Sequence, residues 1–269
     1  MSQMISTSNN NRVIIRIGQG VLSVVALNAS SQITDYASVN MKSGVSAAAN
    51  LREAFKNIDL LKQPYDHADV MLSMPTMLIP ADEFHSEDAS VLYDHTFNGY
   101  DRCIKSSYAI PELHVVAVFS IDKDVKTVMD DHFAESHYVP VCIPVWKHLY
   151  SLSYGKPRQK LYGYFHDGEM YVFCFHQNRF KFNNAFHTSQ VHDALYFLLY
   201  TFSQLGLKGE RDAICIIGSV PQKKWLLDRI RTYVGEVSAP DAKDTGLPDQ
   251  LRWPSIPYDM QTFINQISR

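Results

Sequence analysis

The chain carries the same order of elements twice, and this duplication limits the folds that it can form. In the first half, short turns join three apolar runs with strand character, over residues 12–18, 21–28 and 33–40. A stripe of apolar residues at helical spacing follows over 46–61, and a short strand is expected over 69–74. The order is therefore strand, strand, strand, helix, strand.

The second half repeats that order with different residues. Strands are expected over 161–166, 169–176 and 180–186, then a helix over 188–205 and a buried strand over 213–217. A further helix is expected over 221–234, and a last short helix over 259–267 follows an irregular region at 238–253. Between the two units, residues 85–110 are expected to be helical and residues 113–121 to form a buried strand.

Two such units predict an α/β protein with mixed sheets, in which each half has a three-strand meander followed by helices. We expect a polar tail over 1–11, a first subdomain over 12–136, a connecting segment over 137–159 and a second subdomain over 160–269. One doubly wound α/β domain is the alternative, but parallel sheets of that kind carry consecutive hairpins less often.

Charge and cysteine usage exclude several classes of protein. A net charge of -3 gives no basic face for nucleic acid or for an anionic membrane surface. The chain has no apolar run of the roughly 18 residues that a membrane-spanning helix needs, and no secretory leader is expected. Its four cysteines form no C-x-x-C pair. We therefore expect a cytoplasmic protein with reduced and mostly buried cysteines.

The paired hairpins carry a resemblance to a known fold. RVIIRIGQGVLSVVAL and KLYGYFHDGEMYVFCFHQNRFKFNNAF, each followed by a helix and a strand, resemble the actin-like ATPase fold of the wider ribonuclease H-like architecture. FKFNNAFHTSQVHDALYFLLYTFSQLGL followed by AICIIGSV resembles more closely an uncharacterised bacterial family with that fold, which is distantly similar to the pilus-assembly actin-like proteins. The resemblance covers nearly the whole chain from Arg12 onward.

This resemblance implies where a nucleotide would lie. In the actin-like fold a hairpin turn of each half meets the phosphates through backbone amides, and an Asp two positions before a turn glycine handles magnesium-bound water. A glycine pair after a late strand contacts the adenosine. The candidate cleft residues are Arg16, Gly18, Gly20, Asp167, Gly168, Gly218 and Ser219.

The chain departs from that pattern at the positions that matter for the metal. Two positions before Gly18 stands Arg16, whose guanidinium would repel Mg²⁺, and two positions before Gly168 stands His166. Asp167 is then expected to serve as a turn residue, because a shift of one residue along a strand reverses the side chain's face. After the late strand only Gly218 of the glycine pair remains, and Ser219 has an alternative role as a helix cap.

The remaining cleft residues also have structural explanations. We expect Gly18 and Gly20 to supply the positive φ of a tight hairpin turn. Arg16 is expected to pair with a carboxylate, and pairing with a bound anion is the alternative.

No other catalytic or metal-binding motif is present. None of the eleven histidines has the spacing of metal ligands, and G-x-S-x-G, G-x-G-x-x-G and the P-loop motif are all missing. Aromatic residues crowd the second set of strands. We expect helices to cover them on both faces of the sheet, and an exposed docking patch is the alternative.

The sequence therefore predicts an actin-like protein that works by binding a protein partner, as a scaffold or assembly factor, with no cofactor. The competing hypothesis is an actin-like ATPase or nucleotide switch that binds ATP in an atypical cleft. The two hypotheses differ in the cleft: a scaffold's own side chains fill it, whereas a nucleotide site gathers polar groups around a pocket.

Overall fold

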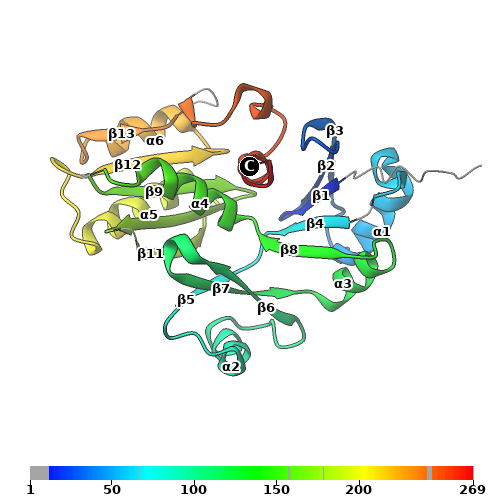
Figure 1. The fold of residues 1–269 in the computed structure, drawn as a ribbon. Coiled ribbons are helices and arrows are strands. Elements are labelled where there is room, and N and C mark those ends of the chain that lie inside the picture. Colours follow the sequence, from blue (N-terminus) through cyan, green and yellow to red (C-terminus); the bar gives the residue numbers. More distant parts are fainter. Residues whose placement is uncertain (1–11, 66, 157, 178, 241–243, 269) are drawn as a thin grey trace, which may run out of the picture.

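The structure is a computed structural model, and it describes residues 12–65, 67–156, 158–177, 179–240 and 244–268. The predicted polar tail over 1–11 lies outside these residues. Figure 1 shows two halves side by side, each built on one sheet, with the C-terminal helix between them.

The first half contains the predicted meander and two parallel strands. Its sheet has the order β3-β2-β1-β4-β8, and β1 pairs with β2 antiparallel and with β4 parallel. The near-continuous apolar residues of β1 and β2 are buried on both faces of the sheet, because both strands lie in its interior. The strands are β1 (Arg12–Ile17), β2 (Val21–Leu27), β3 (Ile33–Asn40), β4 (His67–Leu72) and β8 (Ser136–Pro140).

Two helices cover one face of this sheet. Helix α1 (Ala47–Asn57) begins after Ser46, whose side chain accepts a hydrogen bond from the backbone of Ala49. Helix α3 (Lys123–Asp130) begins after Asp122, which caps it in the same way. Both helices, with the short turn η1 (Asp59–Lys62), pack on the buried side chains of β1, β2 and β4.

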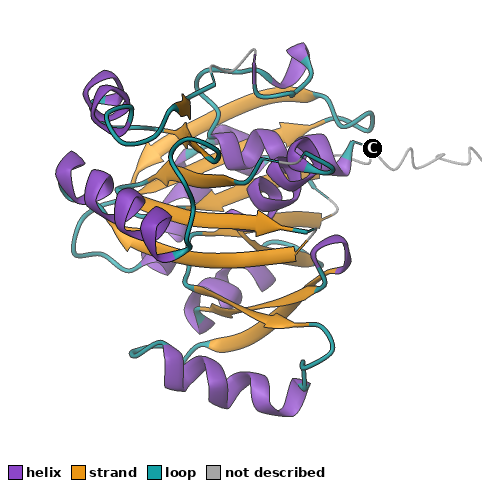
Figure 2. Cartoon of the chain, turned by 90° about the vertical axis from the view of Figure 1, so that its left-hand side faces the viewer, coloured by secondary structure: helices purple, strands orange, loops and turns teal. Residues whose placement is uncertain are grey.

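A small three-stranded sheet is inserted in the first half, and it corrects one expectation. Residues 85–110 are not one helix: α2 (Ser86–Thr96) is followed by a turn and then by β6 (Ile104–Ile110). The helix ends at its C-cap Phe97, whose backbone is extended with φ -123° and ψ 112°, Gly99 then forms the turn with φ +87°, and Pro111 disfavours a helical backbone at residue 110. The sheet has the order β5-β7-β6, with β5 (Thr76–Pro80), η2 (Pro111–Leu113) and β7 (Val115–Ile121). Figure 2 shows it with α2 at the bottom of the molecule.

The second half repeats the topology of the first. Its sheet has the order β11-β10-β9-β12-β13, in which the antiparallel meander again joins a parallel pair of strands. The strands are β9 (Lys160–His166), β10 (Glu169–His176), β11 (Arg179–His187), β12 (Ala213–Gly218) and β13 (Glu236–Ser238). Helices α5 (Val191–Gln204) and α6 (Lys223–Ile230) cover its outer face. The predicted duplication is thus confirmed in topology as well as in order.

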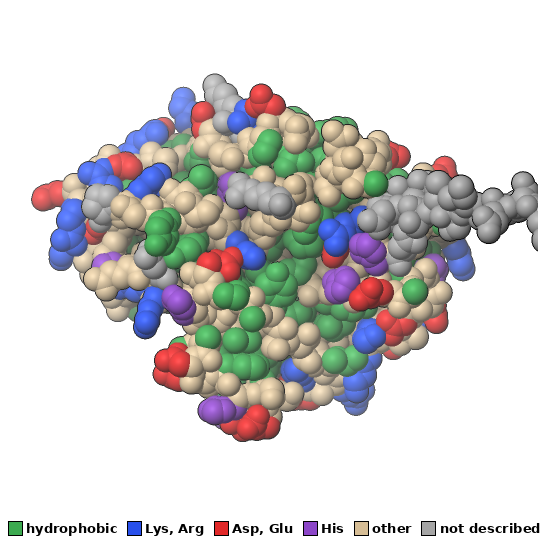
Figure 3. Space-filling model, viewed as in Figure 1, with side chains coloured by type: hydrophobic (Ala, Val, Ile, Leu, Met, Phe, Trp, Pro, Cys, Tyr) green, Lys and Arg blue, Asp and Glu red, His purple; other side chains and the backbone are tan. Residues whose placement is uncertain are grey.

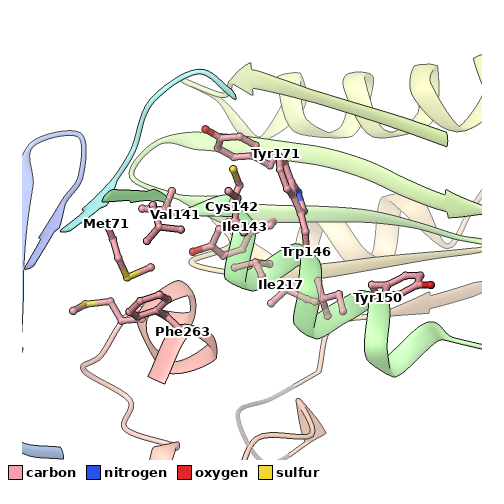
Figure 4. Packing of buried hydrophobic residues seen from close by; sticks show 14 of the residues in the cluster. Met71, Val141, Cys142, Ile143, Trp146, Tyr150, Tyr171, Ile217 and Phe263 are labelled. Carbon is pink, nitrogen blue, oxygen red and sulfur yellow. The ribbon is translucent and has the colours of Figure 1, made fainter. Parts of the chain in front are cut away.

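Two helices lie between the sheets and join the halves. Helix α4 (Cys142–Ser153) falls within the predicted connecting segment 137–159, and α7 (Tyr258–Ile267) follows the short turn η4 (Asp249–Leu251). They pack on each other and on the inner faces of both sheets. Figure 4 shows this shared core, with Met71 from β4, Tyr171 from β10 and Phe263 from α7 around α4. The two halves therefore share this hydrophobic core, in addition to the core that each half has under its outer helices.

This core also covers the aromatic strands of the second half. The predicted covered core is confirmed for β9 and β10, because the inner face of the sheet packs on α4 and α7 and the outer face on α5, whereas Phe180, Phe182 and Phe186 on β11 are partly exposed. Tyr162, Tyr164, Phe165, Tyr171, Phe173 and Phe175 are all buried. Three of the four cysteines are buried too, and all four are free thiols.

Candidate functional site

The two hairpin turns that the sequence singled out meet each other across the halves. The turn between β1 and β2 contains Gln19, whose backbone N–H donates a hydrogen bond to Asp167 Oδ2 at 3.3 Å. The side-chain amide of Gln19 donates to Glu169 Oε1 at 2.9 Å. Asp167 and Glu169 belong to the turn between β9 and β10, so the two turns are bonded directly.

Arg16 lies beneath this contact and binds both halves. Its side chain is 1% exposed. Its Nη2 is 2.8 Å from Asp167 Oδ2, and its Nε is 2.8 Å from one oxygen of Asp259 and 3.0 Å from the other. The predicted carboxylate partner of Arg16 is confirmed, and there are two such partners. Asp259 comes from α7, so one guanidinium links β1, α7 and the second hairpin.

Asp259 is the most deeply buried member of this group, which we name the Arg16 cluster: Arg16, Tyr164, Asp167 and Asp259. Its side chain is fully buried, and besides Arg16 it accepts hydrogen bonds from the backbone of Met260 at 2.7 Å and from the Tyr164 hydroxyl at 2.9 Å. A buried carboxylate is tolerated only with such partners. The cluster therefore holds one cation and two carboxylates, of which Asp259 is fully buried and Asp167 is partly exposed.

The electrostatics of the cluster follow from this packing. Burial pushes the pKa of Asp167 upward, but His166 and Arg16 outweigh burial and hold that pKa below its ordinary value. Burial and the Asp259 carboxylate raise the pKa of Tyr164 well above its ordinary value. Asp167 is thus a carboxylate at neutral pH, and Tyr164 is a hydrogen-bond donor.

The two glycines of the first turn have different roles, and one expectation was wrong. Gly20 has φ +81° and supplies the predicted left-handed turn. Gly18 does not have a positive φ; instead, a Cβ there would lie 2.3 Å from Asp167 Oδ2 and 2.4 Å from Arg16 Nη1. Gly18 is required because the second hairpin and the Arg16 guanidinium come too close for any side chain.

The second turn has the predicted conformation. Asp167 has φ +47° and Gly168 has φ +79°, as in a two-residue hairpin turn. The carbonyl of Gly168 accepts a hydrogen bond from the backbone of Thr188 at 3.1 Å, which ties the turn to the end of β11. Asp167 therefore both forms the turn and binds Arg16.

Gly218 and Ser219 lie at the same end of the second sheet and serve its packing. Gly218 has φ +90°, and a Cβ there would lie 2.1 Å from the carbonyl oxygen of Phe165. The backbone of Ser219 donates to that same oxygen at 2.9 Å. Ser219 does not cap a helix, since α6 begins only at Lys223, after Gln222. Both residues hold the end of β12 against β9.

The chain matches one family of proteins over most of its length. The family profile of DUF3822, described as a protein of unknown function, matches residues 2–237. The chain belongs to the DUF3822 family. Helix α7, which supplies Asp259, lies beyond the matched residues. No match was found among the curated proteins.

Two solved structures support the fold. A crystal structure from Bacteroides thetaiotaomicron, of a protein with an actin-like ATPase fold and unknown function, matches with a TM-score of 0.85 and 22% identity over 98% of this chain and 99% of that chain. The PilM-PilN complex of type IV pilus biogenesis matches with a TM-score of 0.55 and 12% identity over 94% of each chain. The predicted actin-like ATPase fold and the distant likeness to a pilus-assembly protein are confirmed.

Cavities lie elsewhere on the molecule. Five cavities of about 150 to 440 Å³ are lined by described residues. None of these five is lined by a residue of the Arg16 cluster or by Gly18. Across the described ranges, no group of three or more His, Cys, Asp and Glu side chains is placed to hold a metal ion. No helix in the described part of the chain is long and apolar enough to cross a membrane.

Sequence reasoning missed three residues of the site. Gln19 and Tyr164 gave no signal, because a turn glutamine and a strand tyrosine are common. Asp259 gave a weak one: it lies in the first turn of a helix, where an acidic residue is usually solvated, but its neighbours Met260, Phe263 and Ile264 are apolar.

Proposed function

We propose that this protein is a non-catalytic member of the actin-like group that works by binding a protein partner, as a scaffold or assembly factor. One observation carries the proposal. The carboxylate of Asp167 accepts a hydrogen bond from the backbone N–H of Gln19. The resemblance would place a nucleotide phosphate at this turn, so the protein's own carboxylate takes the amide that a phosphate would use.

The residues of the cleft do not fit Mg²⁺-ATP. Where the actin-like fold has a carboxylate for magnesium-bound water, this chain has Arg16. The positive charge of its guanidinium would repel Mg²⁺. The space between the turns is filled by the Arg16 guanidinium and Asp167, which come within van der Waals reach of Gly18. A phosphate would have to displace a buried ion pair, and breaking such a pair costs about 3 to 5 kcal/mol.

The likeness to a pilus protein supports the second part of the proposal. PilM is similar to this chain over nearly its whole length, and its structure is a complex with PilN. An actin-like chain of this size therefore serves as a binding partner in that complex. We infer the same kind of role here, in the cytoplasm and without a cofactor, with a protein partner that is not identified.

Calorimetric titration with nucleotides tests the proposal. The full chain is titrated with ATP and with ADP, each with and without Mg²⁺, and phosphate release is followed in parallel. We expect no saturable heat and no hydrolysis. The variant Asp167→Ala, which removes the carboxylate from the Gln19 amide, is the second sample, and it too should bind no nucleotide, because Asp259 still pairs with Arg16 and no carboxylate for magnesium-bound water is restored.

Two results would reject the proposal. Micromolar, magnesium-dependent binding by the natural chain would show an active nucleotide site. Binding gained in Asp167→Ala alone would show a nucleotide switch whose site is closed by its own aspartate, which is the competing hypothesis.

A further inference from the structure

A cavity of about 320 Å³ lies on the inner face of the second sheet, and its inner end is lined by Tyr258, whose ring is 6.1 Å from the ring of Tyr164 in the Arg16 cluster. It opens between the C-terminal half of α4, the strands β9 and β12, and the loop at 244–246. We name it the α4 cavity. Lys160 at its mouth begins β9, whereas the turn at Asp167 and Gly168 follows the other end of that strand. The α4 cavity is therefore separate from the cleft between the hairpins.

One wall of this cavity is fixed by two contacts. His148 on α4 hydrogen-bonds through Nε2 to the carbonyl oxygen of Thr245 at 2.7 Å. The next residue, Gly246, has φ +74°, and a Cβ there would come within 3.0 Å of the Leu152 side chain. The loop thus packs tightly on α4, so the cavity is part of the fold and not a gap between loose segments.

The interior of the cavity is apolar and aromatic. Leu149 and Leu152 line it from α4, Tyr162 and Ile217 from the sheet, and Tyr258 from the start of α7. Its volume is at the lower end of the range for small-molecule sites, roughly 300 to 1,000 Å³. An apolar body of ten to fifteen non-hydrogen atoms is the size of ligand that such a volume admits, on the order of 20 Å³ for each atom.

The mouth of the cavity is basic. Lys156, Arg158 and Lys160 all line it, and the same three residues line a neighbouring cavity of about 290 Å³. Glu236 forms an ion pair with Arg158 and lies 3.9 Å from Lys160 Nζ. Lys156 is exposed and forms no ion pair with a described carboxylate.

We propose that the α4 cavity binds a small amphipathic anion. Its apolar body would lie against the leucines of α4 and the aromatic rings of the sheet, where burial of apolar surface supplies the affinity. Its single negative head, a carboxylate, sulfonate or phosphate, would lie at the mouth beside Lys156 and Lys160. Only Asp244 among the lining residues opposes this charge.

5-Dimethylaminonaphthalene-1-sulfonate is the fluorescent probe that tests this site, because its aromatic body falls within that size and it carries one anionic group. We expect one molecule to bind the folded chain with a dissociation constant on the order of 10 μM, measured by fluorescence and by calorimetry. Dodecanoate should displace the probe, whereas inorganic phosphate should not, because it lacks an apolar body. Dodecanol should displace it more weakly than dodecanoate, because it lacks the charge.

Variants assign the binding to the cavity. Lys156→Ala should weaken binding about threefold to tenfold, and Leu152→Glu, at a side chain that is already partly exposed, should weaken it at least tenfold. Lys224→Ala removes an equally exposed lysine on α6 and should change nothing. Unchanged binding in both cavity variants, no binding by the natural chain, or displacement by phosphate alone would each overturn the proposal. A thermal melt of every variant excludes unfolding as the source of the fluorescence change.

Discussion

At the scale of single residues, Arg16 decides what the space between the two hairpins contains. Its guanidinium has two carboxylate partners from different parts of the chain, Asp167 and Asp259. A planar group with several donors in a fixed fork can pair with both carboxylates at once, whereas the ammonium of a lysine lacks that bidentate geometry. One side chain thus joins the first hairpin to two carboxylates from distant parts of the chain.

A substitution at Gly18 tests how closely the two hairpins approach each other. In Gly18→Ala the added methyl group would overlap Asp167 Oδ2 and Arg16 Nη1, so we expect the free energy of unfolding to fall by about 1 to 3 kcal/mol. Urea denaturation measures this loss. Gly235→Ala is the matched control, because its Cβ would meet only a carbonyl oxygen at 3.4 Å, and it should cost less than about 0.5 kcal/mol. Equal effects of the two substitutions would contradict the close approach.

Asp167, which is partly exposed, and Asp69, which is buried, should show opposite pH dependences. The pKa of Asp167 is lowered in the folded chain, so its contribution to stability is present above the unfolded pKa of about 3.9 and is lost as the pH falls below it. Burial raises the pKa of Asp69, despite nearby Arg12, so its contribution is present at low pH and is lost as the pH rises through the folded pKa.

Urea denaturation between about pH 3 and pH 6 measures this difference. The stability advantage of the natural chain over Asp167→Asn should grow as the pH rises. The advantage over Asp69→Asn should shrink over the same range. The same sign for both variants would show that the two environments have been misassigned.

The residue types predicted part of this site. A strand arginine without a basic neighbourhood indicates an acidic partner, and an Asp-Gly pair between apolar strands indicates a hairpin turn. The partner Asp259 could not be identified, because it lies 243 positions away and only the packing of α7 brings it to β1. The role of Gly18 could not be identified for the same reason, since the atoms that exclude a side chain belong to the other half.

At the scale of elements, apolar periodicity was enough for the strands of the two meanders and for the helices with one buried face, but the short strands β5, β8 and β13 were not predicted. The six strands of the two meanders lie within about a residue of the predicted limits, and α5 and α7 were also predicted. The prediction of one helix over 85–110 was wrong because β6 has mixed polarity and belongs to a small sheet. Helix α4 was missed because it is buried nearly all round and has no polar face to give a period.

At the scale of the whole molecule, the duplication places the two hairpins opposite each other, and α4 and α7 fix their distance. The core around these helices contains side chains from both sheets. In Figure 3 hydrophobic side chains also reach the surface along the junction of the halves. Order along the chain predicted the repeat, but not that the C-terminal helix would enter the shared core and complete the ion-pair network.

A double-mutant cycle between Arg16 and Asp167 tests most directly the claim that the protein's own charges hold the hairpins together. The free energy of unfolding is measured for the natural chain, Arg16→Met, Asp167→Asn and the double variant, each with and without excess Mg²⁺-ATP. We predict a coupling energy of about 1 to 3 kcal/mol that the nucleotide does not change. A coupling energy near zero, or one that Mg²⁺-ATP abolishes, would contradict this account.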